Sequence, residues 1–257
     1  MSPDPKVFIT GASSGIGAAL AAHYAGKGAV LGLCARRPAP MQALFSSPRW
    51  KGSCYQVDVT DVTSLQAAAA DFTERFGVPD IVIANAGISV GTSTENAEDL
   101  AAFRKIMETN VFGMAVTFQP FVAPMRARRS GTLVGIASVA GFRGLPGGGA
   151  YSASKSAAIT YLESLRVELR GSGVAVVTIC PGYIRTAMTA SNRYPMPFII
   201  DADEAARRFA GAIARKRRFT VIPWQMALVS FALRHLPRWL FDRLFARAPR
   251  KARGLPL

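Results

Sequence analysis

Tyr151 and Lys155 are one helical turn apart in a Tyr-Ser-Ala-Ser-Lys segment. At this spacing on a helix, the two side chains lie on the same face. A fixed ammonium beside a phenol lowers the pKa of the phenol, because the cation stabilises the phenolate. The pair could therefore donate and accept a proton near neutral pH, as a general acid–base catalyst does. The same spacing also occurs by chance on exposed helix faces, so this interpretation needs support from other residues.

A glycine-rich turn, Thr10 to Gly17, separates the first apolar run from the first helix-like segment. Gly11 permits a tight turn, while Gly15 and Gly17 let the backbone approach a ligand and let the helix pack on a sheet. The N-terminus of the following helix offers free N–H groups and a positive dipole end to a phosphate. The turn therefore predicts a dinucleotide site, although an ordinary glycine-rich turn is the alternative.

Strand-like and helix-like segments alternate along the chain and must position these residues. The strand-like runs are 7–9, 30–34, 54–57, 81–84, 132–137, 175–179 and 219–222, and the helix-like segments are 16–27, 62–76, 97–128, 151–171 and 203–214. The alternation predicts an α/β fold with a Rossmann-type, doubly wound parallel sheet of six or seven strands between two helical layers. We expect one catalytic domain over residues 1–222, followed by a short helical extension over 223–257.

Composition restricts the class of protein. Half of the 257 residues are hydrophobic and the mean hydropathy is +0.21, which suits one large domain with a buried parallel sheet. Cys34, Cys54 and Cys180 all lie in apolar runs, so we expect core thiols in a reducing, cytoplasmic compartment. Only two histidines occur, which argues against a Ser-His-Asp hydrolase, and we expect no metal site. No secretory signal or membrane-spanning run is expected.

Taken together and in order, the motifs resemble the short-chain dehydrogenase/reductase family, in its compact single-domain branch. The resemblance spans about residues 6–225. Beyond the turn and the Tyr-x-x-x-Lys pair, Asp58 and Val59 resemble the contact to the adenine ring. Ala84-Asn85-Ala86-Gly87 resembles an Asn-Asn-Ala-Gly motif, with Ala84 in place of the first asparagine.

The resemblance implies specific roles for four catalytic residues. Tyr151 is the proton donor, Ser138 hydrogen-bonds the same substrate oxygen, and Lys155 lowers the pKa of Tyr151 and holds the nicotinamide ribose. Asn110 holds a water that resupplies protons. The cofactor contacts implied are Thr10, Gly11, Ser13, Ser14, Gly15, Ile16, Gly17, Asp58, Val59, Asn85, Ala86, Gly87, Tyr151, Lys155 and the loop residues Pro181, Gly182, Ile184 and Thr186.

The end of the second strand bears on the choice of cofactor. NAD-selective folds place an acidic residue there, which binds the adenosine ribose. Here the acidic position falls on Ala35, and Arg36 and Arg37 follow. A guanidinium matches the 2′-phosphate of NADP in charge and geometry. We therefore expect a preference for NADP(H), with NAD(H) as the second choice; two solvated arginines are the alternative.

The substrate walls are expected to be apolar. Residues 183–200 follow the nicotinamide loop, lack regular periodicity and contain Met188, Tyr194 and Phe198, so we expect a substrate lid there. Residues 88–90 and 141–145 are the other expected walls. These segments indicate a hydrophobic ketone, aldehyde or alcohol.

Positive charge is concentrated near the C-terminus. The net charge is +15, and residues 204–257 hold 13 basic and two acidic residues. Two short helices are expected after Pro223, with Trp239 and Phe245 among arginines. Such a segment is typical of peripheral binding to a membrane surface. The alternatives are that its helices pack on the enzyme body or across a subunit interface, and that its arginines are only solvated.

The function predicted is therefore an NADP(H)-dependent oxidoreductase acting on a ketone or alcohol, as a homodimer or homotetramer. The alternative is a cofactor-binding regulatory or nucleic-acid-binding protein, suggested by a pI near 10.6. The chain carries no nucleic-acid-binding signature, and the excess charge is confined to one end. We therefore expect no nucleic-acid partner.

Overall fold

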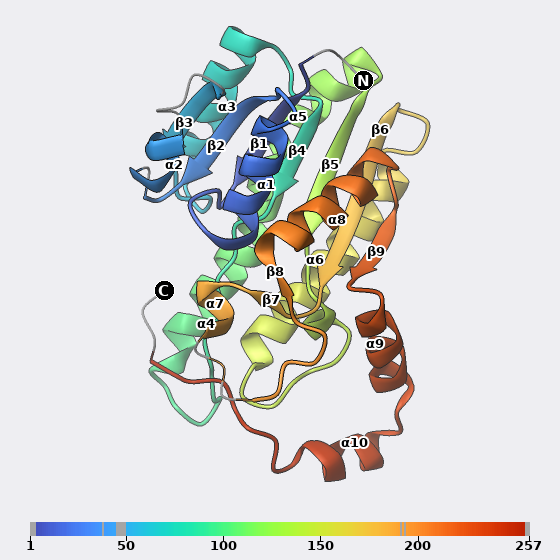
Figure 1. Cartoon of the computed structure of the whole chain (residues 1–257). Coiled ribbons are helices and arrows are strands. Elements are labelled where there is room, and N and C mark those ends of the chain that lie inside the picture. Colours follow the sequence, from blue (N-terminus) through green and yellow to red (C-terminus); the bar gives the residue numbers. More distant parts are fainter. Residues whose placement is uncertain (1–3, 38, 45–49, 191, 193, 255–257) are drawn as a thin grey trace.

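The computed structural model describes residues 4–37, 39–44, 50–190, 192 and 194–254. Seven parallel strands form one sheet in the order β3-β2-β1-β4-β5-β6-β9 (Figure 1). The strands are β1 Lys6–Thr10, β2 Val30–Ala35, β3 Lys51–Gln56, β4 Ile81–Ala84, β5 Gly131–Ile136, β6 Val174–Pro181 and β9 Phe219–Ile222. This order confirms the predicted Rossmann-type, doubly wound sheet.

Helices cover both faces of the sheet because its strands are apolar on both sides. In β1, Val7 and Ile9 belong to one hydrophobic cluster and Phe8 belongs to the other. One cluster includes residues of α1 (Gly15–Ala25) and α8 (Ala202–Ala214). The other includes residues of α3 (Val62–Phe76), α5 (Gly113–Arg128) and α6 (Gly149–Glu168). The three predicted layers are therefore present.

The expected single helix over 97–128 is interrupted. It divides into α4 (Asp99–Met107), a π-helical turn η1 (Glu108–Phe112) and α5. Such a turn fits one extra residue into a helix and is frequent at functional sites. Here it contains the buried Asn110, whose amide bonds to the backbone of the 85–88 loop.

Several short elements have no counterpart in the predicted set, since they contain too few residues to show a period. They are α2 (Ala39–Leu44), the 3₁₀ turn η2 (Val139–Gly141) and α7 (Ala187–Ala190), together with the two-stranded pair β7 (Ile184–Arg185) and β8 (Ile200–Asp201). The expected irregular lid over 183–200 therefore contains three of these short elements.

The C-terminal extension forms the two expected helices, α9 (Gln225–His235) and α10 (Arg238–Phe245). Arg143 joins them to the body: its guanidinium donates to the carbonyls of Leu233 and Leu236 and lies 4.1 Å from the ring centre of Phe241. Beyond α10 the chain turns back toward α4 (Figure 1). Residues 1–3 and 255–257, at the ends of the two expected domain ranges, lie outside the described residues. Among the helices described, none has the length and apolar character needed to cross a membrane.

Candidate active site

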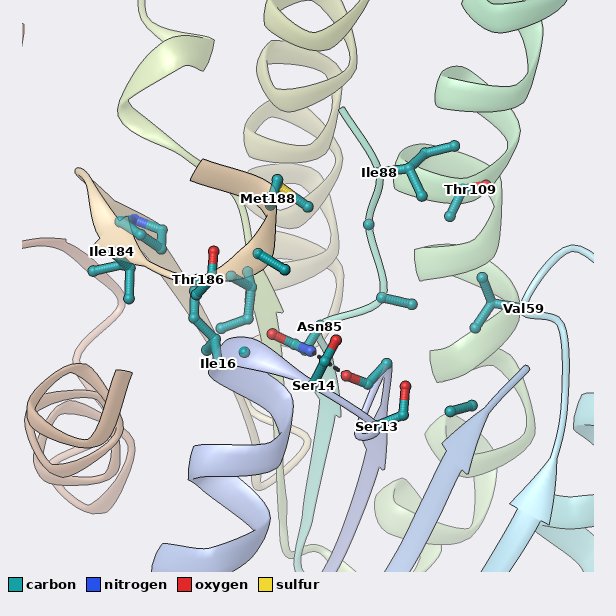
Figure 2. A pocket seen from close by; sticks show the side chains of 18 of the residues that line it. Ser13, Ser14, Ile16, Val59, Asn85, Ile88, Thr109, Ile184, Thr186 and Met188 are labelled. Carbon is teal, nitrogen blue, oxygen red and sulfur yellow. Dashed lines mark hydrogen bonds between the residues drawn. The ribbon is translucent and has the colours of Figure 1, made fainter. Parts of the chain in front are cut away.

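A cavity of about 260 Å³ lies at the carboxyl ends of the strands, where the sheet order reverses between β1 and β4. Ligands of doubly wound folds bind at this switch point. Ser13 and Ser14 lie on the turn after β1, with Thr186 and Met188 on one side and Thr109 on the other (Figure 2).

The glycine-rich turn has the conformation that its sequence requires. Gly11 and Gly15 have φ values of 68° and 55°, in the left-handed region that favours glycine. A Cβ at Gly17 would overlap the carbonyl oxygen of Gly11 and lie 2.6 Å from Asn85 Nδ2. The turn therefore brings bare backbone to the cavity and packs α1 tightly against β1.

Asn85 links this turn to the loop after β4. Its Nδ2 donates to the carbonyls of Thr10 and Gly11, both at 3.1 Å. The Thr10 hydroxyl accepts from Asn85 N at 3.3 Å. These contacts do not depend on the first position of the Asn-Asn-Ala-Gly motif, which is Ala84 here, because Asn85 makes all of them.

Charged residues line the part of the cavity that adjoins the ends of β2 and β3. Arg36 and Arg37 are exposed and line the cavity directly after β2, beside Ala35. Asp58 Oδ1 accepts from Thr60 N and Oγ1. Burial acts to raise the pKa of Asp58, but the Thr60 hydrogen bonds and the nearby Arg36 charge outweigh it and lower that pKa. Asp58 is therefore a carboxylate at neutral pH.

Tyr151, Ser138 and Lys155 meet at the opposite end of this cavity. Ser138 follows β5, and its hydroxyl accepts from Ala140 N at 3.1 Å and hydrogen-bonds to Tyr151. Tyr151 and Lys155 both come from the start of α6. The Lys155 ammonium donates to the carbonyl of Ile136 at 2.9 Å and lies 5.8 Å from the centre of the Tyr151 ring.

The acid–base properties of this pair differ from the sequence-based expectation. Burial raises the pKa of Tyr151, and the Ser138 hydrogen bond opposes the rise only in part. Burial also lowers the pKa of Lys155 to about 8. The expected lowering of the Tyr151 pKa by Lys155 is absent because desolvation dominates and the ammonium points to Ile136 rather than to the phenol. Tyr151 is accordingly a protonated phenol at neutral pH.

Asn110 holds the loop after β4 against α6. Its Oδ1 accepts from Ile88 N at 2.8 Å, while Nδ2 donates to Ile88 O and Ser154 Oγ, both at 3.0 Å. A Cβ at Gly87 would lie 3.2 Å from Asn110 Oδ1 and 3.5 Å from Lys155 Nζ. The π-turn thus places Asn110 next to the space between Gly87 and Lys155.

Most of the residues expected at the site line this cavity. They include Gly11, Ser13, Ser14, Gly15, Ile16, Val59, Asn85, Ala86, Gly87, Pro181, Gly182, Ile184 and Thr186. Thr10, Gly17 and Asn110 are not among the lining residues and act through their neighbours. Sequence reasoning missed Thr109, Met188 and Thr189 as lining residues. Met188 fell within the expected substrate lid, whereas no pattern marked Thr109.

A second cavity of about 290 Å³ adjoins the first at Ser138, Tyr151 and Met188. Its walls include Ser89 and Leu145, which come from two segments expected to flank the substrate. Four lining residues come from the C-terminal extension, which sequence reasoning did not place near the site: Phe245, Ala248, Pro249 and Lys251. No local pattern marks them, because their position depends on the path of the whole extension.

Comparison with known proteins identifies the family. The model of the short chain dehydrogenase family matches residues 5–196. An uncharacterized oxidoreductase of Myxococcus xanthus is 40% identical over 239 residues, covering 91% of this chain and 94% of the relative. Dehydrogenase/reductase SDR family member 7B of Mus musculus is 32% identical, covering 96% of this chain and 82% of the relative.

A solved structure agrees with this relationship. A short chain dehydrogenase from Burkholderia cenocepacia, in complex with NADP, superposes with a TM-score of 0.82 at 25% identity, covering 97% of this chain and all of that one. The family match, these relatives and the shared fold lead to one conclusion. The chain belongs to the short-chain dehydrogenase/reductase family and is an oxidoreductase.

Proposed function

We propose that this chain reduces an apolar ketone or aldehyde with NADPH, or oxidises the corresponding alcohol with NADP⁺. The observation that carries the proposal is the position of Ser138 and Tyr151, which line both cavities. A cofactor in the first cavity and a substrate in the second would meet at these two hydroxyl groups.

The residues of the first cavity fit a nicotinamide dinucleotide. Gly11 and Gly15 leave bare backbone at the N-terminus of α1, which suits a pyrophosphate. Thr186 lies close to Gly15, since a Cβ added there would be 3.2 Å from Thr186 Cγ2. Asp58 and Val59 would hold the adenine, and the loop from Pro181 to Thr186 would hold the nicotinamide.

The catalytic residues then have distinct tasks. When bound, the cofactor would supply the hydride for carbonyl reduction, or accept it in alcohol oxidation. Tyr151 donates the proton to the developing oxyanion, and Ser138 donates a hydrogen bond to the same oxygen. Lys155 is largely charged at neutral pH and would hold the cofactor ribose. Asn110 positions the loop beside Lys155 and would hold the water that resupplies protons.

Arg36 supports a preference for NADPH over NADH. It lines the cavity at the end of β2, directly after Ala35. Because Ala35 has no carboxylate, this position can neither bind the ribose hydroxyls of NADH nor repel the 2′-phosphate of NADPH. A guanidinium binds a phosphate through charge-assisted hydrogen bonds. NADH is the second choice of cofactor, because the other residues proposed to bind the dinucleotide would contact NADH and NADPH alike.

The second cavity supports an apolar substrate. Val139, Leu145, Met188, Pro195 and Phe245 contribute much of its wall. Tyr183 and Tyr194 add aromatic rings, which lie 6.3 Å apart between centroids. Such a wall favours a hydrophobic carbonyl compound.

We also propose that the protein forms a homodimer or homotetramer. Leu100 and Phe103 on α4 and Val167 on α6 are exposed apolar residues on the two helices expected to form a homodimer or homotetramer. Light scattering during gel filtration measures this directly. A monomer at micromolar concentration would contradict the proposal.

The exposed side of the extension supports peripheral binding to an anionic membrane. Trp224, Phe231 and Trp239 are exposed there, among exposed arginines such as Arg238 and Arg243. Co-sedimentation with vesicles containing phosphatidylglycerol should exceed that with phosphatidylcholine alone, and replacing Trp239 with alanine should weaken it. Equal recovery without vesicles would overturn this proposal.

Replacing Tyr151 with phenylalanine tests the central proposal. We expect kcat to fall by about 10²- to 10⁴-fold for carbonyl reduction, since a positioned proton donor contributes that much. Oxidation of NADPH at 340 nm would be followed over ketones and aldehydes of increasing chain length. NADPH binding, measured by fluorescence, should be unchanged.

Tyr161→Phe is the matched control, because it removes a phenol from the same helix at a position outside both cavities. A Tyr151→Phe protein that keeps full turnover would contradict the assigned mechanism. Wild-type protein that binds NADPH without turning over any carbonyl or alcohol would favour a regulatory role instead.

A further inference from the structure

The C-terminal tail, residues 246–254, is held across the second cavity at a defined position. Arg253 donates to Asp99 at 2.7 Å and to Glu98 at 3.1 Å, both at the start of α4. The carbonyl of Ala252 accepts from Gly91 N at 2.8 Å. These contacts fix the backbone on one side of Lys251, and Pro249 contributes to the cavity wall on the other side.

Lys251 occupies the centre of this docked tail. Its ammonium donates to Ser89 Oγ at 2.7 Å and lies 5.8 Å from the centre of the Tyr151 ring. An ammonium has three donors, so the Ser89 bond leaves two for other partners. Glu98 and Asp99, the acidic side chains that hold the tail, are paired with Arg253. No salt bridge to Lys251 occurs among the described residues.

The surroundings of Lys251 make this charge unusual. It is the single charged side chain among the described residues that line the second cavity. Burial lowers the pKa of its ammonium to about 8, so most of the molecules carry the charge at neutral pH. A partly desolvated ammonium without a counter-ion is costly, and an anionic ligand relieves that cost.

We propose that Lys251 binds an anionic oxygen group, a carboxylate or phosphate, on an otherwise apolar carbonyl substrate. The proposal rests on the proposed reductase function and refines its substrate class. The apolar walls would hold the hydrocarbon part, Tyr151 and Ser138 would face the carbonyl, and Lys251 would bind the charged group. Lys251 is thus a specificity-determining residue supplied by the tail.

Ligand binding tests this without requiring turnover, so its outcome is separable from that of the reductase proposal. Decanoate, decyl phosphate and decanol share one alkyl chain and differ in the charged group. Isothermal titration calorimetry on the full chain, with and without NADPH, would compare their dissociation constants. We expect at least one of the two anions to bind about tenfold or more tighter than decanol, since a charged hydrogen bond is worth that much.

Variants identify the residue responsible. Lys251→Met should abolish the preference for the anion with little change for decanol, and Lys251→Arg should retain it. Arg247→Met removes an exposed charge from the same tail and should change nothing. If Lys251→Met does not fold, as judged by circular dichroism, Lys251→Gln replaces it.

Each outcome has a definite meaning. A preference for only one of the two anions supports the proposal and identifies the group. Equal affinity for decanol and both anions, or a preference that survives in Lys251→Met, overturns it. Equal weakening of all three ligands in Lys251→Met also overturns it, because Lys251 would then only hold the tail in place. With a matching keto acid and its methyl ester, Lys251→Met should raise KM for the acid alone.

Discussion

The two cavities that meet at Tyr151 share lining residues such as Ser138 and Met188 but differ in the segments that complete their walls. The first cavity, where we propose that the cofactor binds and which we call the cofactor cavity, is lined by loops that directly follow strands of the sheet, such as Gly11 after β1 and Asn85 after β4. Part of the wall of the second cavity comes from Phe245, Ala248, Pro249 and Lys251, which lie at or after the end of α10, the second of two helices outside the sheet. The cofactor cavity is therefore formed by loops of the fold that the family shares, while one part of the wall of the second cavity depends on a peripheral segment. Changes in substrate specificity can accumulate in such a segment without disturbing the cofactor site.

The largest expected effect comes from breaking the cofactor cavity. In Gly17→Ala, the added Cβ would overlap the Gly11 carbonyl and approach Asn85 Nδ2 to 2.6 Å. The turn must shift, so we expect the free energy of unfolding to fall by about 1–3 kcal/mol and NADPH binding to be lost. Chemical denaturation and fluorescence titration measure the two effects.

Gly149→Ala is the matched control for that substitution. Gly149 lies at the first position of α6, and a Cβ added there meets nothing within 4 Å. Its stability and NADPH affinity should match those of the wild type. Normal NADPH binding by Gly17→Ala would contradict the close packing of the turn.

The next effect concerns pH. Since burial lowers the pKa of Lys155 to about 8, its ammonium loses its proton as the pH rises through that value, with Cys180 and Tyr151 as its titratable neighbours. The pKa of Tyr151 is raised, so its phenol stays protonated over the same range. We expect kcat/KM for carbonyl reduction to be constant below pH 8 and to fall about tenfold per unit above it.

The Lys155→Arg variant tests whether Lys155 is the group whose titration causes the decline, because a guanidinium stays charged over the whole pH range of the measurement. The decline above pH 8 should disappear in the variant, whatever its absolute rate. An unchanged decline would assign the titration to another group.

A smaller effect is expected at the part of the cofactor cavity that adjoins the end of β2. Arg36→Asp would remove the proposed donor to the 2′-phosphate of NADPH and add a carboxylate that repels that phosphate. The ratio of kcat/KM for NADPH to that for NADH should fall by about 10- to 100-fold. Arg170→Asp makes the same change of charge at an exposed site away from the cavity and should leave the ratio unchanged. Tighter NADH than NADPH binding by the wild type would contradict the assignment.

The sequence predicted features that depend on local backbone requirements. Gly11 and Gly15 adopt positive φ values that a glycine-rich turn implies, and the alternation of strand-like and helix-like segments predicted the parallel, doubly wound sheet of seven strands. The family resemblance extended this to Ser138 and Tyr151, which lie together at the cavity.

Features that depend on distant contacts were not predictable. The π-turn at residues 108–112 includes Asn110, whose amide hydrogen-bonds to Ile88 and Ser154. The spacing of apolar residues along the helix gives no sign of these hydrogen bonds. The pKa of Tyr151 depends on burial by the folded chain rather than on the spacing to Lys155. Lys251 lies at the second cavity in a tail that is held by residues far away in the sequence, among them Asp99, which accepts from Arg253.

The smallest effect tests whether the two cavities are separable. Arg143→Met removes the hydrogen bonds to the carbonyls of Leu233 and Leu236 and the contact with the Phe241 ring, which together hold the extension against the body. The tail should then sample positions away from the second cavity. We expect KM for the carbonyl substrate to rise by about three- to tenfold, with the dissociation constant of NADPH unchanged. Arg238→Met, an exposed arginine at the start of α10, should have neither effect. If NADPH binding weakened as much as KM rose, the extension would support both cavities, and the division between a shared cofactor site and a peripheral substrate wall would fail.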